Sequence, residues 1–239
     1  MEVAPGIWRL GSAYVNWYVI DAGGKLTVLD AALPGYYGQF LDLLAALGRP
    51  PSDVEAVLLT HGHSDHTGSA DAVRTAAGCR VLIHEADRPL AARGGSRPKR
   101  LPLHRPAMVK AGLHMARNGG LRKSPVAGLE SFQDGEVLDV PGKPRIIHAP
   151  GHTPGSCAVW LQDRDVLFSG DVLVTLNIAT GATGPMVPSA GFNWDQPQAA
   201  ASLDVIASLQ ADRILPGHGE PWNGPVSEAV RLARAAARS

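Results

Sequence analysis

The chain has 239 residues, of which 45% are apolar, and its 22 basic side chains balance its 22 acidic ones. This length and apolar content suit one large α/β domain with a full core. The zero net charge disfavours a general attraction to nucleic acid, and no apolar run reaches the ~20 residues of a membrane-spanning helix.

Cysteine usage and the first residues bear on where the protein works. Cys79 and Cys157 are the only cysteines, too few and too far apart for a disulfide framework. The N-terminal stretch has no basic segment followed by an apolar one, as a secretory signal would. We therefore expect a cytoplasmic protein with no membrane partner.

Short strands alternate with helices along the first third of the chain. A glycine-containing turn at 21–25 predicts a hairpin, because glycine adopts positive φ without steric cost. Apolar residues recur with helical period before Gly48 and Pro50, which end that helix. The patterns predict strands at 6–10, 14–20, 26–29, 54–60 and 79–84, and helices at 36–47 and 69–77.

Residues 85–130 differ in composition from the rest of the chain. They hold ten basic and three acidic side chains, a local charge of +7, with five prolines and the pair Gly94-Gly95. We interpret them as a basic, partly helical cap inserted into a single domain that spans 1–239. The alternative is a solvated basic loop, since charge runs are usually exposed surface.

The second half of the chain again alternates strands and helices. Residues 175–194 are rich in Gly, Thr and Pro and have little periodicity, which predicts a long loop. The patterns predict strands at 136–140, 145–149, 156–161, 165–169 and 212–215, and helices at 196–209 and 226–237.

Three histidines and a carboxylate stand together between a predicted strand and a helix, in the stretch Thr60-His61-Gly62-His63-Ser64-Asp65-His66. Extended backbone around Gly62 can point His61 and His63 to one side, and the other two follow where the chain bends. Solvated loop histidines are the alternative, but that interpretation suits a lone histidine. The cluster predicts a metal site, for which nitrogen and carboxylate ligands favour Zn²⁺, with Fe or Mn compatible.

The stretch His61-Gly62-His63-Ser64-Asp65-His66 resembles the His-x-His-x-Asp-His signature of the metallo-β-lactamase superfamily. Four more stretches resemble elements of that family in its order: 27–30, 151–156, 167–171 and 215–219. The resemblance implies an α/β fold, a four-layered αβ/βα sandwich of two mixed β-sheets flanked by helices. It also implies that metals lie in the cleft between the sheets.

The resemblance further implies two Zn²⁺ ions per chain. The implied ligands are His61, His63 and His152 for the first ion, Asp65, His66 and His218 for the second, and Asp171 as a bridge. Asp30 would orient the ligands from behind, although an aspartate that merely ends a strand is the alternative. The resemblance also implies catalytic roles for His63 and Asp65. Asp65 can pass a proton to the leaving group.

The activity implied by the resemblance is hydrolysis of a small ester, thioester or lactone by a hydroxide that bridges the metals. Asp171 resembles the glyoxalase II and lactonase branches, since true β-lactamases usually carry Cys or Ser there. Two features depart from those branches. The chain ends about twenty residues after His218, without the C-terminal domain of glyoxalase II, and Val174 stands where acyl-homoserine lactonases usually carry Tyr.

Other functions stay open at this stage. Within the superfamily they are hydrolysis of β-lactams or phosphodiesters. Outside hydrolysis, the chain could be a persulfide dioxygenase with a single iron, or a non-catalytic metal-binding module that binds a partner. The complete second ligand set disfavours the iron enzyme, and a structural zinc site would need no open position.

We expect a small-molecule substrate, with anionic compounds among the candidates, because cap cations can hold a carboxylate. Nucleic acid is disfavoured, since the basic residues lack interleaved aromatics. Predicted substrate contacts are Trp194 and Phe192 from the 175–194 loop, and Arg97 and His114 from the cap. The sequence does not decide the oligomeric state, a homodimer being one option.

Overall fold

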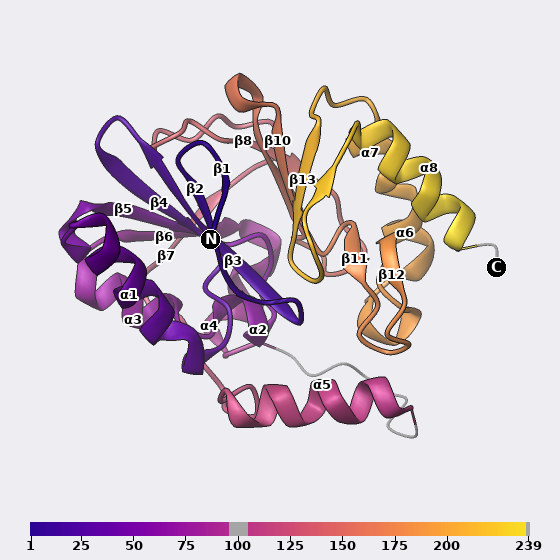
Figure 1. The fold of residues 1–239 in the computed structure, drawn as a ribbon, viewed down its shortest axis with the longest axis horizontal. Helices are drawn as coiled ribbons and strands as arrows, with labels where there is room; N and C mark the ends of the chain where they lie inside the picture. Colours follow the sequence, from indigo (N-terminus) through magenta and orange to yellow (C-terminus); the bar gives the residue numbers. More distant parts are fainter. Residues whose placement is uncertain (96–104, 238–239) are drawn as a thin grey trace.

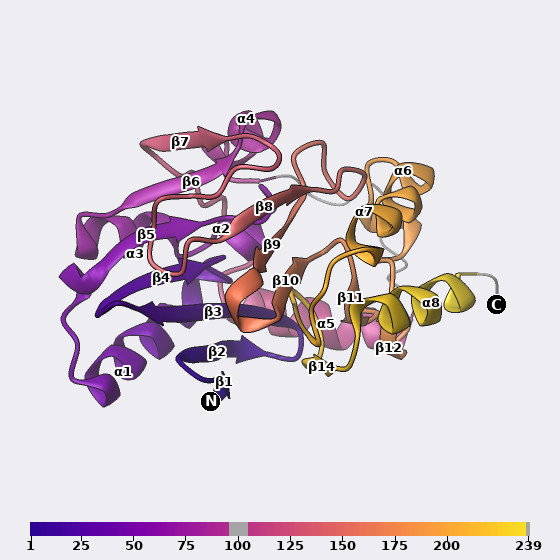
Figure 2. The ribbon, with the colours of Figure 1, turned by 90° about the horizontal axis from the view of Figure 1, so that it is seen from above.

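Two β-sheets lie face to face in the middle of the structure, and helices cover the outer face of each sheet (Figures 1 and 2). The computed structural model describes residues 1–95 and 105–237. Each large sheet contains both parallel and antiparallel strand pairs. The predicted four-layered αβ/βα sandwich is therefore confirmed.

The first sheet has seven strands in sequence order. Its N-terminal strands pair antiparallel, and those from β4 onward run parallel. Parallel neighbours need a crossover connection, which helices α1 (Tyr37–Leu47) and α3 (Ala70–Ala77) provide. The strands are β1 (Glu2–Ala4), β2 (Ile7–Ser12), β3 (Val15–Ala22), β4 (Lys25–Leu29), β5 (Val54–Leu58), β6 (Arg80–His84) and β7 (Leu129–Phe132).

The second sheet has the strand order β14-β13-β10-β9-β8, in which only β10 and β13 run parallel. A small separate sheet pairs β11 (Val174–Leu176) with β12 (Thr183–Met186). The five strands are β8 (Arg145–His148), β9 (Cys157–Leu161), β10 (Val166–Gly170), β13 (Arg213–Pro216) and β14 (Trp222–Asn223). The helices on this side are α6 (Gln196–Ala201), α7 (Leu203–Ala207) and α8 (Val226–Ala236).

The core consists of three apolar clusters, one for each interface between layers. The central cluster joins the two sheets, where Phe168 of β10 meets Tyr18 of β3 with ring centroids 5.2 Å apart. An outer cluster packs Phe40 of α1 against the first sheet, and another packs Ile206 of α7 against the second. Both faces of the central strands are buried, so these strands are nearly continuous apolar runs in the sequence.

Three predicted elements differ from the structure. The strand predicted at 136–140 is only an isolated bridge at Val137, because the following turn contains two prolines without an N–H and Lys143 at a φ of 43°. The predicted loop 175–194 contains most of the β11–β12 hairpin. The helix predicted over 196–209 divides at Ser202, whose hydroxyl donates to the carbonyl of Pro150 at 2.6 Å.

The segment predicted as a cap contains α4 (Arg88–Ala92) and α5 (Pro106–Arg117). Helix α5 lies along the lower side of the molecule in Figure 1, beneath both sheets. The last residues of the predicted insertion form β7, so the part outside the sheets ends before Leu129. Along the described parts of the chain, no helix has both the length and the apolar character needed to cross a bilayer.

Candidate metal centre

Five of the predicted ligands lie shortly after the C-terminal ends of strands, and Asp65 and His66 lie in the short helix α2 (Ser64–Thr67) that follows β5. His61 and His63 follow β5, His152 follows β8, Asp171 follows β10 and His218 follows β13. Because β10 runs parallel to β13, their C-terminal ends meet at one edge of the second sheet. Two sheets therefore contribute to one cluster of side chains, although their residues are far apart in sequence.

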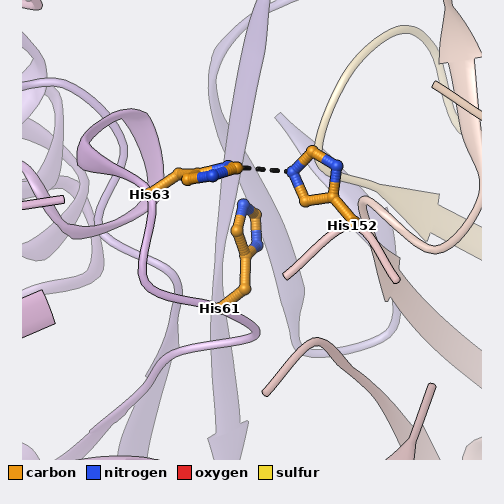
Figure 3. A group of neighbouring side chains, drawn as sticks. All are labelled: His61, His63 and His152. Atoms are coloured by element: carbon orange, nitrogen blue, oxygen red, sulfur yellow. Dashed lines mark hydrogen bonds between the residues drawn. The ribbon is translucent and has the colours of Figure 1, made fainter. Parts of the chain in front are cut away.

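The first group within this cluster is His61, His63 and His152, whose ligand atoms lie within 4.8 Å of one another. Nδ1 of His63 is 2.9 Å from Nε2 of His152. Figure 3 shows the three rings directed toward one shared space, with His61 between the other two. The ring planes are nearly perpendicular, at 82° to 85°, so the nitrogens converge rather than the ring faces.

The second group is Asp65, His66 and His218, which also meets the 4.8 Å limit. Asp171 lies between the two groups. Its Oδ2 is 3.0 Å from Nε2 of His218 and 3.2 Å from Nε2 of His152. Its Oδ1 is 3.5 Å from Nε2 of His66. One carboxylate therefore faces histidines of both groups.

Asp30 holds two of the histidines from behind. Its Oδ2 lies 2.9 Å from Nδ1 of His66, and both carboxylate oxygens accept from the Thr60 hydroxyl at 2.9 and 3.0 Å. That hydroxyl is 3.1 Å from Nδ1 of His61. With Nδ1–H as the donor in both rings, each Nε2 keeps a free lone pair directed into the cluster.

The remaining histidines also have partners behind them. Nδ1 of His152 is 2.8 Å from Oδ1 of Asn193, and Nδ1 of His218 contacts the carbonyl of Tyr14. His63 differs, because its Nδ1 faces the other histidines. No spacing pattern in the sequence indicates Asn193, which lies 41 positions from the histidine that it supports.

Two buried polar atoms in the cluster make no hydrogen bond, Nε2 of His61 and Oδ1 of Asp171. Leaving a buried polar atom unpaired costs roughly 1–3 kcal/mol, so such atoms call for a ligand. Imidazole nitrogens and carboxylate oxygens are the donors that Zn²⁺ and similar cations accept. The side chains present therefore fit bound metal ions.

Protonation differs between the two groups of the cluster. Burial lowers the pKa of His61 well below 6.5 and that of His63 to about 3, so both are neutral ligands. Burial alone would raise the pKa of Asp171, but the surrounding histidines lower it well below its usual value. Burial likewise opposes the charge on His66, yet Asp171 and Asp30 raise its pKa to about 10.

The family model of the metallo-beta-lactamase superfamily matches residues 10–218. The chain belongs to the metallo-β-lactamase superfamily. The resemblance found in the sequence is thus confirmed over most of the chain.

Relatives of this superfamily member include the Bacillus subtilis protein named "Probable metallo-hydrolase YflN". It is 28% identical over 235 residues, which cover 93% of this chain and 87% of the relative. A metallo-beta-lactamase family protein from Thermus thermophilus is 27% identical with a TM-score of 0.71, covering 99% of this chain and 81% of that structure. A metallo-beta-lactamase from Cronobacter sakazakii has a TM-score of 0.71 at 21% identity, covering 100% and 92% of the two chains, and supports the fold alone.

Asp87 also belongs to the site of this chain, although no motif in the sequence indicated it. It is fully buried at the end of the 3₁₀ turn that follows β6. Its Oδ2 accepts from the Gly62 N–H at 2.8 Å and from the Thr153 hydroxyl at 2.6 Å, and its Oδ1 accepts from the Gly155 N–H at 2.8 Å. One carboxylate thus ties the loop of the first two histidines to the loop of His152.

A cavity of about 320 Å³ opens beside the cluster, and five predicted ligands line it. Those five are His63, Asp65, His152, Asp171 and His218. Cavities that bind drug-sized ligands measure about 300–1,000 Å³, so this one suits a small molecule.

The predicted substrate contacts lie at different places. Phe192 lines the cavity. Trp194 is 50% exposed and is not among the residues that line the cavity. His114 lies behind the cavity wall, with its ring centroid 4.9 Å from that of Tyr14. Arg97 lies outside the described residues.

Replacing Asp30 with asparagine should weaken zinc binding by roughly 10- to 100-fold, since an amide has one acceptor oxygen and cannot accept both from the Thr60 N–H on Oδ1 and from His66 on Oδ2. Asparagine tolerates the φ of 57° at this position, so the backbone should persist. Competition with a chromophoric chelator measures the affinity. Asp165→Asn is the matched control, because Asp165 has a φ of 52° in an exposed turn. Equal affinities of Asp30→Asn and the wild type would contradict this role.

Zinc binding should release protons. Asp171 raises the pKa of both His66 and His218 against the effect of burial, and the value for His66 is about 10. A group with a raised pKa holds its proton below that pKa, so zinc must displace the proton of His66 at pH 8. We expect at least one proton released per chain and an affinity that rises with pH between about 6.5 and 10. Titration calorimetry in two buffers of different ionisation enthalpy measures the release, and equal heats would contradict it.

Proposed function

We propose that this chain is a metal-dependent hydrolase that acts on a small ester, thioester or lactone and uses two Zn²⁺ ions. The observation that carries the proposal is that five of the seven predicted ligands line the cavity. A structural zinc site is closed by its protein ligands, whereas a catalytic site keeps a position open to substrate. The family membership and the name of YflN as a probable metallo-hydrolase agree with this conclusion.

The proposed assignment of ligands follows the two groups. His61, His63 and His152 would hold one ion, and Asp65, His66 and His218 the other, with Asp171 facing both. Bound metal ions supply a Lewis acid for the attacked carbonyl and lower the pKa of a water molecule. Two complete groups favour this assignment over a single-iron oxygenase.

The protein's own residues position the substrate and move the proton. Asp65 is the cluster carboxylate with the more exposed side chain, 19% against 4% for Asp171, and it lines the cavity. Its Oδ2 lies 3.7 Å from Nε2 of His218. A carboxylate at this edge can accept a proton and deliver it to a leaving alkoxide or thiolate.

Metal analysis and a substrate panel test the proposal together. The purified protein should bind about two zinc ions per chain, and the zinc-loaded form should hydrolyse lactones or thioesters. β-Lactams and phosphodiesters complete the panel, and metal-free protein is the control. One iron per chain with oxygen uptake on persulfides would contradict the proposal, as would hydrolysis restricted to phosphodiesters.

A further inference from the structure

The wall of the cavity opposite the metal cluster is apolar. Helix α5 contributes Met108, Ala111, Gly112 and Met115, which are spaced three, four and seven positions from the first and share one helical face. Met108 and Ala111 are buried, with 4% and 2% exposure. This face therefore forms an apolar wall of the cavity.

The other side of this wall comes from the segment that follows β10. Leu176, Ile178 and Phe192 line the cavity there. Asn177, between Leu176 and Ile178, also lines the cavity. Its Oδ1 accepts hydrogen bonds from the Ser189 hydroxyl at 3.0 Å and from the Ala179 N–H at 3.0 Å. Apolar side chains therefore make up most of this side of the wall.

The charge of the cavity distinguishes between substrates. Among the described residues that line it, none is Lys or Arg. The lysine and arginine of α5, Lys110 and Arg117, are exposed and do not line the cavity. The charged residues that do line it are carboxylates and histidines of the metal cluster. A substrate carboxylate directed away from the metals would meet no cation among the described lining residues.

We infer that the site takes an uncharged ester, thioester or lactone whose apolar acyl chain lies against α5. This inference rests on the proposed function and adds the class of substrate. Gly112 lines the cavity at an exposed position of this wall, and a Cβ built there meets no atom within 4 Å, so a larger side chain fits at this position and would project beside the acyl chain. Burial of apolar surface against this wall then favours longer acyl chains.

A series of uncharged p-nitrophenyl esters, from acetate through butyrate and hexanoate to octanoate, tests the inference with zinc-loaded protein. Each buried methylene should raise kcat/KM by roughly fourfold until the cavity is full. Gly112→Leu should reduce kcat/KM for octanoate at least tenfold and leave acetate unchanged. Gly38→Leu is the matched control, since Gly38 also lies in an exposed helical position with no atom within 4 Å of its Cβ.

Binding of uncleavable amides separates this inference from the proposed function. Octanamide should bind the wild type more tightly than acetamide by calorimetry, and Gly112→Leu should remove that difference. If no ester, thioester or lactone is hydrolysed but this binding pattern holds, the proposed function fails and the apolar subsite stands. Equal kcat/KM for all chain lengths, or a preference for a monosuccinate ester over the neutral butyrate, would overturn the subsite and leave the hydrolase assignment intact.

Discussion

Replacing His63 with alanine should abolish turnover while the free energy of unfolding of the metal-free protein changes by less than about 1 kcal/mol. Its Nδ1 lies 2.9 Å from Nε2 of His152, and the residue lines the cavity. The substitution removes one donor from the first group, so this group can no longer complete its metal coordination. Steady-state kinetics, metal content and urea unfolding measure the three expectations.

His148→Ala is the matched control for this prediction. His148 is the last residue of β8 and stacks on His84 with ring centroids 4.1 Å apart, and it belongs to neither group of metal ligands. The control should keep its zinc and its turnover. Normal rates from His63→Ala with a full complement of metal would contradict the assigned ligand set.

Replacing Asp87 with alanine should lower the free energy of unfolding by about 2–5 kcal/mol and weaken zinc binding. The substitution leaves three donors without their acceptor, the N–H groups of Gly62 and Gly155 and the hydroxyl of Thr153, and a buried unpaired donor costs about 1–3 kcal/mol. The effect should reach both histidine loops, because the carboxylate holds both. Urea unfolding and chelator competition measure stability and affinity.

The loops also pack tightly on Asp87. A Cβ at Gly155 would lie 2.7 Å from the Cβ of Asp87, so only glycine fits against it there. Asp87→Asn should have a smaller effect than alanine, because the amide keeps one acceptor oxygen. Asp134→Asn is the control, since Asp134 accepts from the His148 N–H at 2.8 Å in an exposed setting. A wild-type unfolding curve for Asp87→Ala would contradict the bridging role.

Local patterns predicted much of the fold. The hairpin between β3 and β4 forms around its two glycines, and the buried strands β5, β6 and β10 form where apolar runs predicted them. Predictions that depended on longer-range contacts were less accurate. The division between α6 and α7 arises at Ser202, whose partner Pro150 lies 52 positions away. Helical periodicity contains no information about such a partner.

The sequence alone determined the family, the layered α/β architecture and the close spacing of His61, His63, Asp65 and His66, because these follow from local motifs and strand ends. Only the tertiary structure decided that His152, Asp171 and His218 meet them across two sheets, and that Asp87 joins two of the loops. It also decided that α5 closes an apolar cavity beside the cluster. Backbone geometry and hydrophobic period act over a few residues, whereas these contacts join segments tens of positions apart.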